Sequence, residues 1–148
     1  MKQPPVYILG GAQSDFARNW AREGKHFVDV MGEIVTDAIA SSKIEPHEVE
    51  TAHVGNFAAE LYAKQGHIGA FFLEIDPTFS GLPTSRHEAA CASGSIALIA
   101  ASAEIEAARY DLACVVGVEQ MKTVDQAASR DAKMFSGGVL EYGRTFVG

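Results

Sequence analysis

The sequence predicts an α/β domain built on a mostly parallel sheet, and three observations support this prediction. Continuous apolar runs from Val6 to Leu9 and from Leu112 to Val118 are typical of buried strands. Between them, apolar residues recur at helical spacing from Phe27 to Ser42 and again from Ala92 to Ala108. Alternating strands and helices favour right-handed crossovers between parallel strands. A chain of 148 residues is long enough for one domain with its own core.

The N-terminal part of the chain predicts two strands that flank one amphipathic helix. The first strand, Val6 to Leu9, is ended by Gly10-Gly11. The helix from Phe27 to Ser42 places its apolar residues on one face, and Pro46 marks the turn that follows. Thr51 to Phe57 then predicts a second strand.

The next part predicts two helices around an extended segment. Ala58 to Phe72 is expected to be helical, with interruptions at its two glycines. Leu82 to Ala90 is expected to be extended. The alanine-rich pattern from Ala92 to Ala108 is apolar on nearly every side, so we expect a helix buried between two layers. Leu112 to Val118 is expected to be a parallel strand covered on both faces.

The most informative stretch for function runs from His87 to Ser95 and places Cys91 where the extended segment meets the alanine-rich helix. Backbone N–H groups at a helix start lack intrahelical partners, and their partial positive charge favours the reactive thiolate. Ser93, Gly94 and Ser95 are small, so a substrate can approach the sulfur closely. This pattern predicts a nucleophile for covalent catalysis. The alternative is a small core cysteine, because cysteine is among the most buried residue types.

The string Glu88-Ala-Ala-Cys-Ala-Ser-Gly-Ser95, followed by the alanine-rich helix and by Asp111-Leu-Ala-Cys-Val-Val-Gly-Val-Glu-Gln-Met121, resembles the nucleophile region of the thiolases. Within that family it is most similar to the sterol-carrier-protein-type branch. Pro5 to Gly11, Val54 to Phe57 and Gly117 to Met121 are similar to other family segments and follow in the same order. The resemblance implies that Cys91 carries an acyl group as a thioester.

The resemblance also implies an organisation and a reaction. Residues 1–121 would form the N-terminal α/β domain, and residues 122–148 would begin the substrate-covering loop region, which is cut short. The reaction would be thiolytic cleavage or Claisen condensation of a 3-oxoacyl-CoA in lipid metabolism, with coenzyme A as co-substrate and no permanently bound cofactor. In the family a second half supplies a histidine, a second cysteine and an asparagine motif. No Gly-His-Pro, Cys-x-Gly or Asn-Glu-Ala-Phe string occurs in this chain, so that half is expected from elsewhere.

Charge and hydropathy limit the classes of binding partner and indicate the cell compartment. The formal net charge of −7 argues against nucleic acid or an anionic membrane as the main partner. No apolar run approaches the ~20 residues that span a bilayer. No apolar signal segment precedes the first strand, and a working thiolate suits a reducing compartment, so we expect the cytoplasm.

The two cysteines and five histidines suggest no metal centre or disulfide framework. Cys114 lies inside an apolar run and is expected to be inert core. The Gly-Gly turn lacks the spacing of a dinucleotide fingerprint. No two histidines have helical ligand spacing, so a metal site is not expected. His67 and Tyr62 are expected in the core or on the surface, although both could line a pocket.

The residues around Cys91 leave two functional alternatives to the thiolase interpretation. His87 precedes Cys91 by four residues, about 13 Å along an extended chain, so a Cys–His hydrolase needs a sharp bend. A structural or interface role is expected for His87 instead. Arg86 and Glu88 are expected to pair or to face a partner surface. The second alternative is a non-catalytic assembly subunit, or a fragment, with a thiolase-like fold.

A final expectation concerns assembly. One sheet can shield only one side of the helix from Ala92 to Ala108, which leaves an apolar stripe that needs another layer. By resemblance, the segment Pro83 to Ala90 pairs across the family's dimer interface. We therefore expect these residues to function in a homo-oligomer or with a complementary C-terminal half or subunit.

Overall fold

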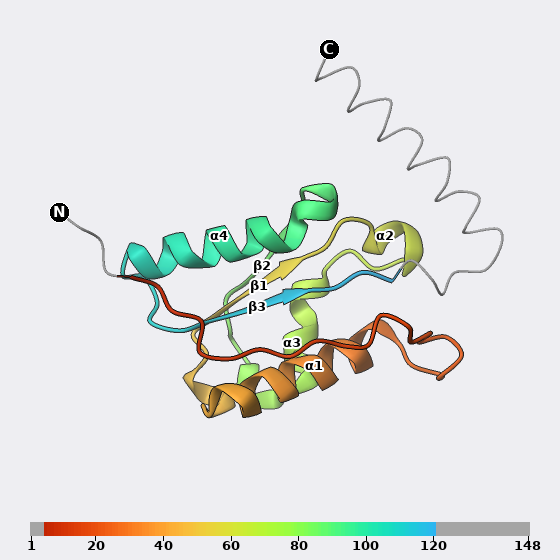
Figure 1. Cartoon of the computed structure of the whole chain (residues 1–148), viewed down its shortest axis with the longest axis horizontal. Coiled ribbons are helices and arrows are strands. Elements are labelled where there is room, and N and C mark those ends of the chain that lie inside the picture. The colour runs from red at the N-terminus through yellow and green to blue at the C-terminus, as the bar shows by residue number, and fades with distance from the viewer. Residues whose placement is uncertain (1–4, 121–148) are drawn as a thin grey trace, which may run out of the picture.

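The computed structural model describes residues 5–120, which form a three-stranded parallel sheet with helices on both faces (Figure 1). The strands are β1 (Thr51–Gly55), β2 (Thr84–His87) and β3 (Ala113–Gly117), in the order β2-β1-β3. The sheet confirms the predicted α/β class with parallel pairing. Because the strands are parallel, their carboxyl ends meet at one edge of the sheet, and the segments that follow β1, β2 and β3 gather there.

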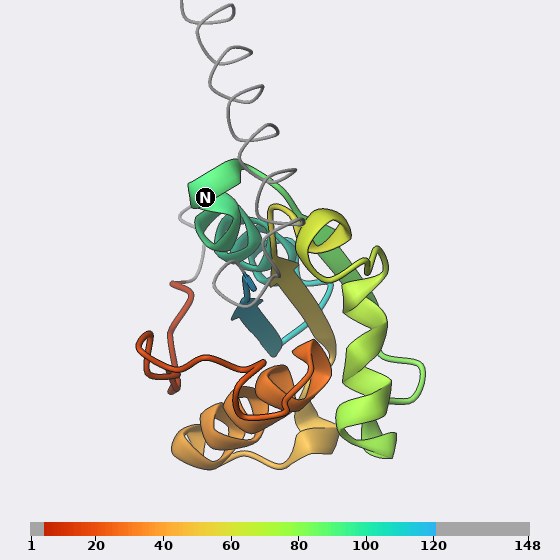
Figure 2. The same cartoon turned by 90° about the vertical axis from the view of Figure 1, so that its right-hand side faces the viewer.

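One face of the sheet carries the main hydrophobic core. Helix α1 (Phe27–Ser42) has the bounds that its periodicity predicts, and it packs on this face with α3 (Phe71–Ile75), as Figure 2 shows. The backbone N–H of His26 donates to the Asp29 carboxylate at 2.7 Å and so caps α1. The buried side chains of this core come from β1, from both helices and from the 3₁₀ turn Pro77–Phe79: Phe27, Met31, Val35, Ala52, Val54, Phe71, Phe72 and Phe79.

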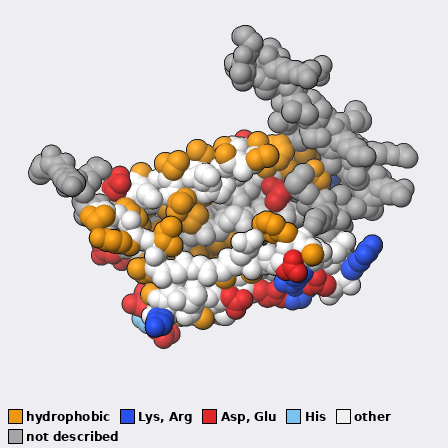
Figure 3. All heavy atoms as spheres, in the orientation of Figure 1, with side chains coloured by type: hydrophobic (Ala, Val, Ile, Leu, Met, Phe, Trp, Pro, Cys, Tyr) orange, Lys and Arg blue, Asp and Glu red, His pale blue; other side chains and the backbone are white. Residues whose placement is uncertain are grey.

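The opposite face of the sheet is covered by α4 (Ser93–Glu106), which the sequence predicted as a helix. The sequence predicted a helix between two layers, and residues 5–120 supply only one of them, so the apolar stripe expected on the other side is exposed. Only Ser93, Ala97 and Ala101 are buried, whereas Ile99 is 63% exposed. The physical reason is that the sheet shields one side of α4 and residues 5–120 contain no second layer for the other. Figure 3 shows hydrophobic side chains along α4 and over the N-terminal segment.

Three expected elements differ from the structure. The prediction of a buried strand from Val6 to Leu9 is wrong: Tyr7 is 74% exposed and Ile8 is 80% exposed, because no neighbouring strand in residues 5–120 pairs with this run. Strand β3 is half-buried rather than covered on both faces, since it lies at an edge of the sheet.

The expected helix from Ala58 to Phe72 is also broken into shorter pieces. It becomes α2 (Ala59–Tyr62), a 3₁₀ turn at Ile68–Ala70 and α3. The break falls at Gly66 and Gly69, where a missing side chain lowers helix stability. At Gly69 an added Cβ would lie 2.7 Å from the Thr84 hydroxyl, so packing against β2 requires glycine there. None of the helices in residues 5–120 has the length and apolar character that crossing a bilayer requires.

Candidate active site

Cys91 lies in a 3₁₀ turn, Ala90–Ala92, between the end of β2 and the start of α4. This is the strand-to-helix junction that the sequence predicts for it. Cys91 is exposed, so it is not the small core cysteine that was the alternative interpretation. A reagent or substrate in solution therefore has access to the sulfur.

Hydrogen bonds from side chains hold this turn in place. The Ser93 hydroxyl accepts from the Ala89 N–H at 2.9 Å and donates to the Ala90 carbonyl at 2.7 Å. The Glu88 carboxylate accepts from the Ala90 N–H at 2.7 Å. Ala90 has a φ of +49°, which costs conformational energy for a residue other than glycine and is sustained by these bonds. Ser93 thus stabilises the turn through these two hydrogen bonds, a role that its small size alone did not reveal.

Gly55 sets how closely the first turn of α4 approaches the sheet. A Cβ added to Gly55, at the end of β1, would lie 2.6 Å from both the Cα and the backbone N of Gly94. Backbone therefore packs directly on backbone at this crossing, and no side chain fits between the strand and the first turn of α4. The sequence suggested that Gly94 leaves room for substrate, and a Cβ added to Gly94 indeed meets nothing within 4 Å, so it is Gly55 that lets α4 approach β1.

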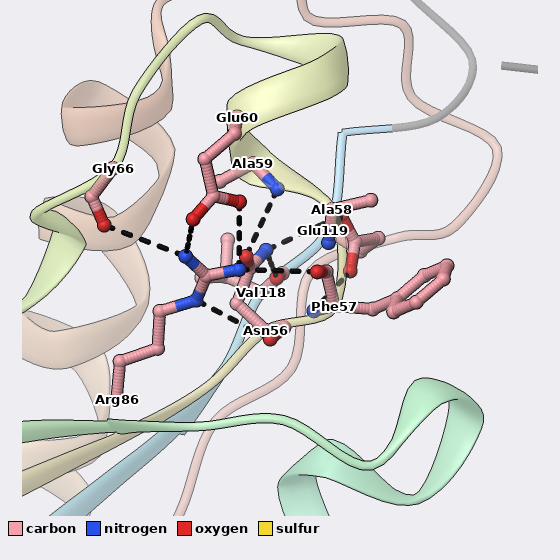
Figure 4. A network of polar contacts seen from close by, with 9 residues as sticks. All are labelled: Asn56, Phe57, Ala58, Ala59, Glu60, Gly66, Arg86, Val118 and Glu119. Atoms are coloured by element: carbon pink, nitrogen blue, oxygen red, sulfur yellow. Dashed lines mark hydrogen bonds and ion pairs between the residues drawn. The ribbon is translucent and has the colours of Figure 1, made fainter. Parts of the chain in front are cut away.

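Asn56 and Glu119 connect the segments that follow β1 and β3. The buried Asn56 side-chain amide donates to the Val118 carbonyl at 2.8 Å and to the Glu119 carboxylate at 3.2 Å. Its amide oxygen accepts from the Ala59 N–H at 3.0 Å, at the start of α2. The Glu119 carboxylate in turn accepts from the Phe57 N–H at 2.8 Å. These bonds, drawn in Figure 4, bind the edge of the sheet beside the Cys91 turn into one network.

Arg86 completes this network from β2. Its guanidinium forms an ion pair with Glu60, with Nη2 to Oε2 at 2.9 Å, and donates to the Phe57 carbonyl at 3.0 Å. The hydrogen bond from Arg86 lowers the pKa of Glu60. The ion pair of Arg86 is thus with Glu60 rather than with Glu88, because parallel register puts Arg86 opposite Val54 and within reach of the β1–α2 loop. The alternative, that Arg86 and Glu88 face a partner surface, stays a prediction.

His87, which is half-buried, forms a pair with the buried His53. Its Nε2 lies 2.9 Å from His53 Nδ1, the two rings stack, and the Ser85 hydroxyl contacts both nitrogens. His53 Nε2 lies 3.2 Å from the Glu104 carboxylate of α4. Burial is the main cause that lowers the pKa of His87, and the neighbouring His53 adds to it. Sequence reasoning did not anticipate this pair, because it depends on the register between β1 and β2. These contacts give His87 the structural role expected for it.

The remaining candidates have no catalytic geometry. Cys114 packs against the core on β3, and burial raises the pKa of its thiol to about 11. It therefore stays protonated at neutral pH. His67 is exposed, and Tyr62 lines a hollow between α1 and α2 that also contains His26 and Phe27. Among residues 5–120, no cluster of three histidine, cysteine or carboxylate side chains has the arrangement of a metal site.

A comparison with protein families now adds to this geometry. Residues 6–142 match the family described as thiolase, N-terminal domain. The chain belongs to the thiolase family. Val54 to Phe57 and Gly117 to Met121 are two of the segments that resemble the family, and a hydrogen bond from Asn56 to Glu119 joins them. Residues 122–148, expected to begin the substrate-covering loop region, lie outside the described residues.

Curated relatives agree with the family assignment. An acetyl-CoA acetyltransferase of Methanocaldococcus jannaschii is 34% identical over 84% of this chain and 31% of its own length. An acetyl-CoA acetyltransferase of Methanothermobacter thermautotrophicus is 31% identical over 80% of the chain and 30% of its own length. Non-specific lipid-transfer protein-like 2 of Caenorhabditis elegans is 27% identical over 80% of the chain and 27% of its own length. The thiolase chain thus spans about a third of the curated relatives it matches.

Proposed function

We propose that this chain supplies the nucleophile of a thiolase-type acyltransferase, and that Cys91 is that nucleophile. The observation that supports the proposal most directly is the exposed Cys91, which lies on a strand-to-helix turn held by hydrogen bonds, in a chain of the thiolase family. Relatives that bear the name acetyl-CoA acetyltransferase point to an acyl-CoA as the substrate and to coenzyme A as the co-substrate. No permanently bound cofactor is needed for this chemistry, and a reducing compartment such as the cytoplasm would keep the thiol available.

The proposed reaction proceeds in two steps through an acyl-cysteine. The Cys91 thiolate attacks the 3-oxo carbon of a 3-oxoacyl-CoA, and the bond between carbons 2 and 3 breaks to release the enolate of acetyl-CoA, which takes up a proton. The thiolate of coenzyme A then attacks the thioester, takes the acyl group and returns Cys91 as thiolate. The condensation is the reverse sequence. Dividing the reaction in this way replaces one difficult step by two easier ones.

The acyl oxygen and the enolate oxygen both need preorganised hydrogen-bond donors. In our proposal the backbone N–H of Cys91 donates a hydrogen bond to the acyl oxygen. The proton-transfer groups and the donors for the enolate come from a complementary half or subunit. This chain has no string that resembles the corresponding family motifs. The exposed apolar side of α4 gives that second part a surface to pack against.

Acylation of Cys91 tests the proposal. The enzyme in its complete form is incubated with an acyl-CoA and its intact mass is measured. The expected result is an acyl adduct that is lost in Cys91→Ser and retained in Cys114→Ser. The second variant is the matched control, because it removes the other cysteine, which is partly buried. An adduct that persists in Cys91→Ser would contradict the assignment.

A second candidate is a non-catalytic assembly subunit, which the exposed apolar side of α4 favours. In that case Cys91 has no special reactivity. Its rate of alkylation by iodoacetamide, measured beside free cysteine at the same pH, distinguishes the two. A rate well above that of free cysteine supports catalysis, and an equal rate supports the assembly subunit.

A further inference from the structure

A hollow of about 430 Å³ opens beside the Cys91 turn, lined by Phe57, Glu60, Arg86 and Glu88. Its walls come from the loop after β1, from α2 and from the end of β2. Glu88 belongs to the turn that carries Cys91, since its carboxylate accepts from the Ala90 N–H. Through Glu88 the hollow borders the turn that carries the proposed nucleophile. Phe57 is apolar, whereas the other three lining residues are charged.

The main chain of Phe57 is held from two sides by opposite charges. Glu119, which follows β3, accepts from the Phe57 N–H at 2.8 Å. Arg86, on β2, donates to the Phe57 carbonyl at 3.0 Å. Two segments far apart in the sequence therefore fix the N–H and the carbonyl of the same residue. Hydrogen bonds to charged groups are stronger than those between neutral groups.

The Arg86 side chain is itself fixed by several partners. Its ion pair with Glu60 uses two guanidinium nitrogens, and Nε donates to the Asn56 carbonyl at 3.4 Å. Figure 4 shows that the Phe57 ring extends away from these ionic contacts. A planar guanidinium with several donors can hold a loop in this way, and a lysine cannot reproduce the arrangement.

We infer that Arg86 is a positioning residue, which together with Glu119 fixes Phe57 as one wall of the space that receives the acyl group on Cys91. The inference rests on the proposed acyl transfer to Cys91. An acetyl group ends close to the sulfur, whereas a longer acyl chain must pass the wall. Removing the wall, or loosening its support, therefore shifts acyl selectivity toward longer chains.

The test compares kcat/KM for a hexanoyl donor with kcat/KM for an acetyl donor in the complete enzyme. Phe57→Ala removes the wall and Arg86→Gln removes its support. Both are expected to raise the hexanoyl-to-acetyl ratio by about tenfold, the size of effect that a methylene or two in an apolar pocket can produce. The double variant should show no further rise, because the two changes act on one wall. Arg109→Gln, which alters an exposed arginine at the far end of α4, is the matched control and should leave the ratio unchanged.

Two further measurements separate the possible failures. If Arg86→Gln does not fold, Glu60→Gln removes the ion pair while Arg86 keeps its bonds to the main chain, and it should raise the ratio to a smaller extent. An unchanged ratio in Phe57→Ala and in the folded Arg86 or Glu60 variant, with acylation of Cys91 intact, would overturn this inference alone. Absence of the Cys91 adduct in the unmodified enzyme would overturn the proposed function and this inference with it.

Discussion

The two faces of the sheet differ in how completely they are covered. On the face of α1 and α3, aromatic and branched side chains fill a continuous core, and Phe72 and Met31 are about 1% exposed. On the face of α4, contact with the sheet is made by Ser93 and small alanines, while Ile96, Leu98 and Ile99 face outward. The same face carries the histidine pair and the Cys91 turn. The covered face supplies stability, and the half-covered face carries the candidate chemistry and an exposed apolar surface, which we assign to a second layer.

The largest expected effect follows from truncating the covered face. Phe72→Ala should lower the free energy of unfolding by about 3–5 kcal/mol, because it removes a fully buried ring and leaves a cavity. Leu73→Ala, its neighbour in α3, is 54% exposed and should cost far less. Denaturant unfolding of both variants measures the difference. Equal losses would show that the two sides of α3 are packed alike, contrary to the structure.

The covered face is also the part that sequence reasoning describes best. Helix α1 has its predicted bounds, because the apolar spacing and the buried side of the helix coincide. The run from Val6 to Leu9 has an equally apolar pattern, yet it forms no strand, since a strand needs a neighbouring backbone that local composition cannot provide. The contacts of Arg86, His53 and Glu119 were also missed, because each depends on how three separate strands align. Cys91 could be placed because a strand-to-helix junction is a local feature.

The next largest loss of stability is expected from a substitution where α4 crosses β1. Gly55→Ala should destabilise the fold by about 1–3 kcal/mol, since its Cβ would meet the backbone of Gly94 at 2.6 Å and neither strand nor helix can yield easily. It should also slow acylation of Cys91 by displacing the turn.

The control for this change is Gly11→Ala, where an added Cβ meets nothing within 4 Å. A thermal melt compares both variants with the unmodified protein. A melting temperature for Gly55→Ala equal to that of Gly11→Ala would mean that α4 does not lie so close to β1.

The histidine pair should make the α4 face sensitive to acid. The pKa of His87 is lowered in the folded chain, so below its unfolded value of about 6.5 the unfolded chain binds a proton that the folded chain resists. Stability should therefore fall as pH drops below about 6.5, and the loss should stop only below the lowered folded pKa. The groups that face His87 in this cluster are His53, Ser85 and, through His53, Glu104.

Melting temperatures at pH 7.5 and 5.5 measure this dependence. The decrease should be smaller in His87→Gln, because the glutamine does not titrate. His47→Gln, which changes an exposed histidine, is the control and should keep the full decrease. A decrease of equal size in His87→Gln would assign the acid sensitivity to other groups.

The smallest effect on stability, and the sharpest test of the comparison, is expected on the outward side of α4. Ile99 is 63% exposed, so Ile99→Ser should change the free energy of unfolding of the separated chain by no more than about 0.5 kcal/mol.

The same change should weaken association, because the apolar side of α4 is the surface that we assign to a second layer. Light scattering over a range of concentrations should show oligomers or a complex for the unmodified chain and a shift toward monomer for Ile99→Ser. Ser102→Ala, on the same helix, alters a hydroxyl that bonds back to the Leu98 carbonyl and should leave association unchanged. A compact, concentration-independent monomer in the unmodified chain would show that the α4 face needs no cover, and that the two faces of the sheet differ in composition alone.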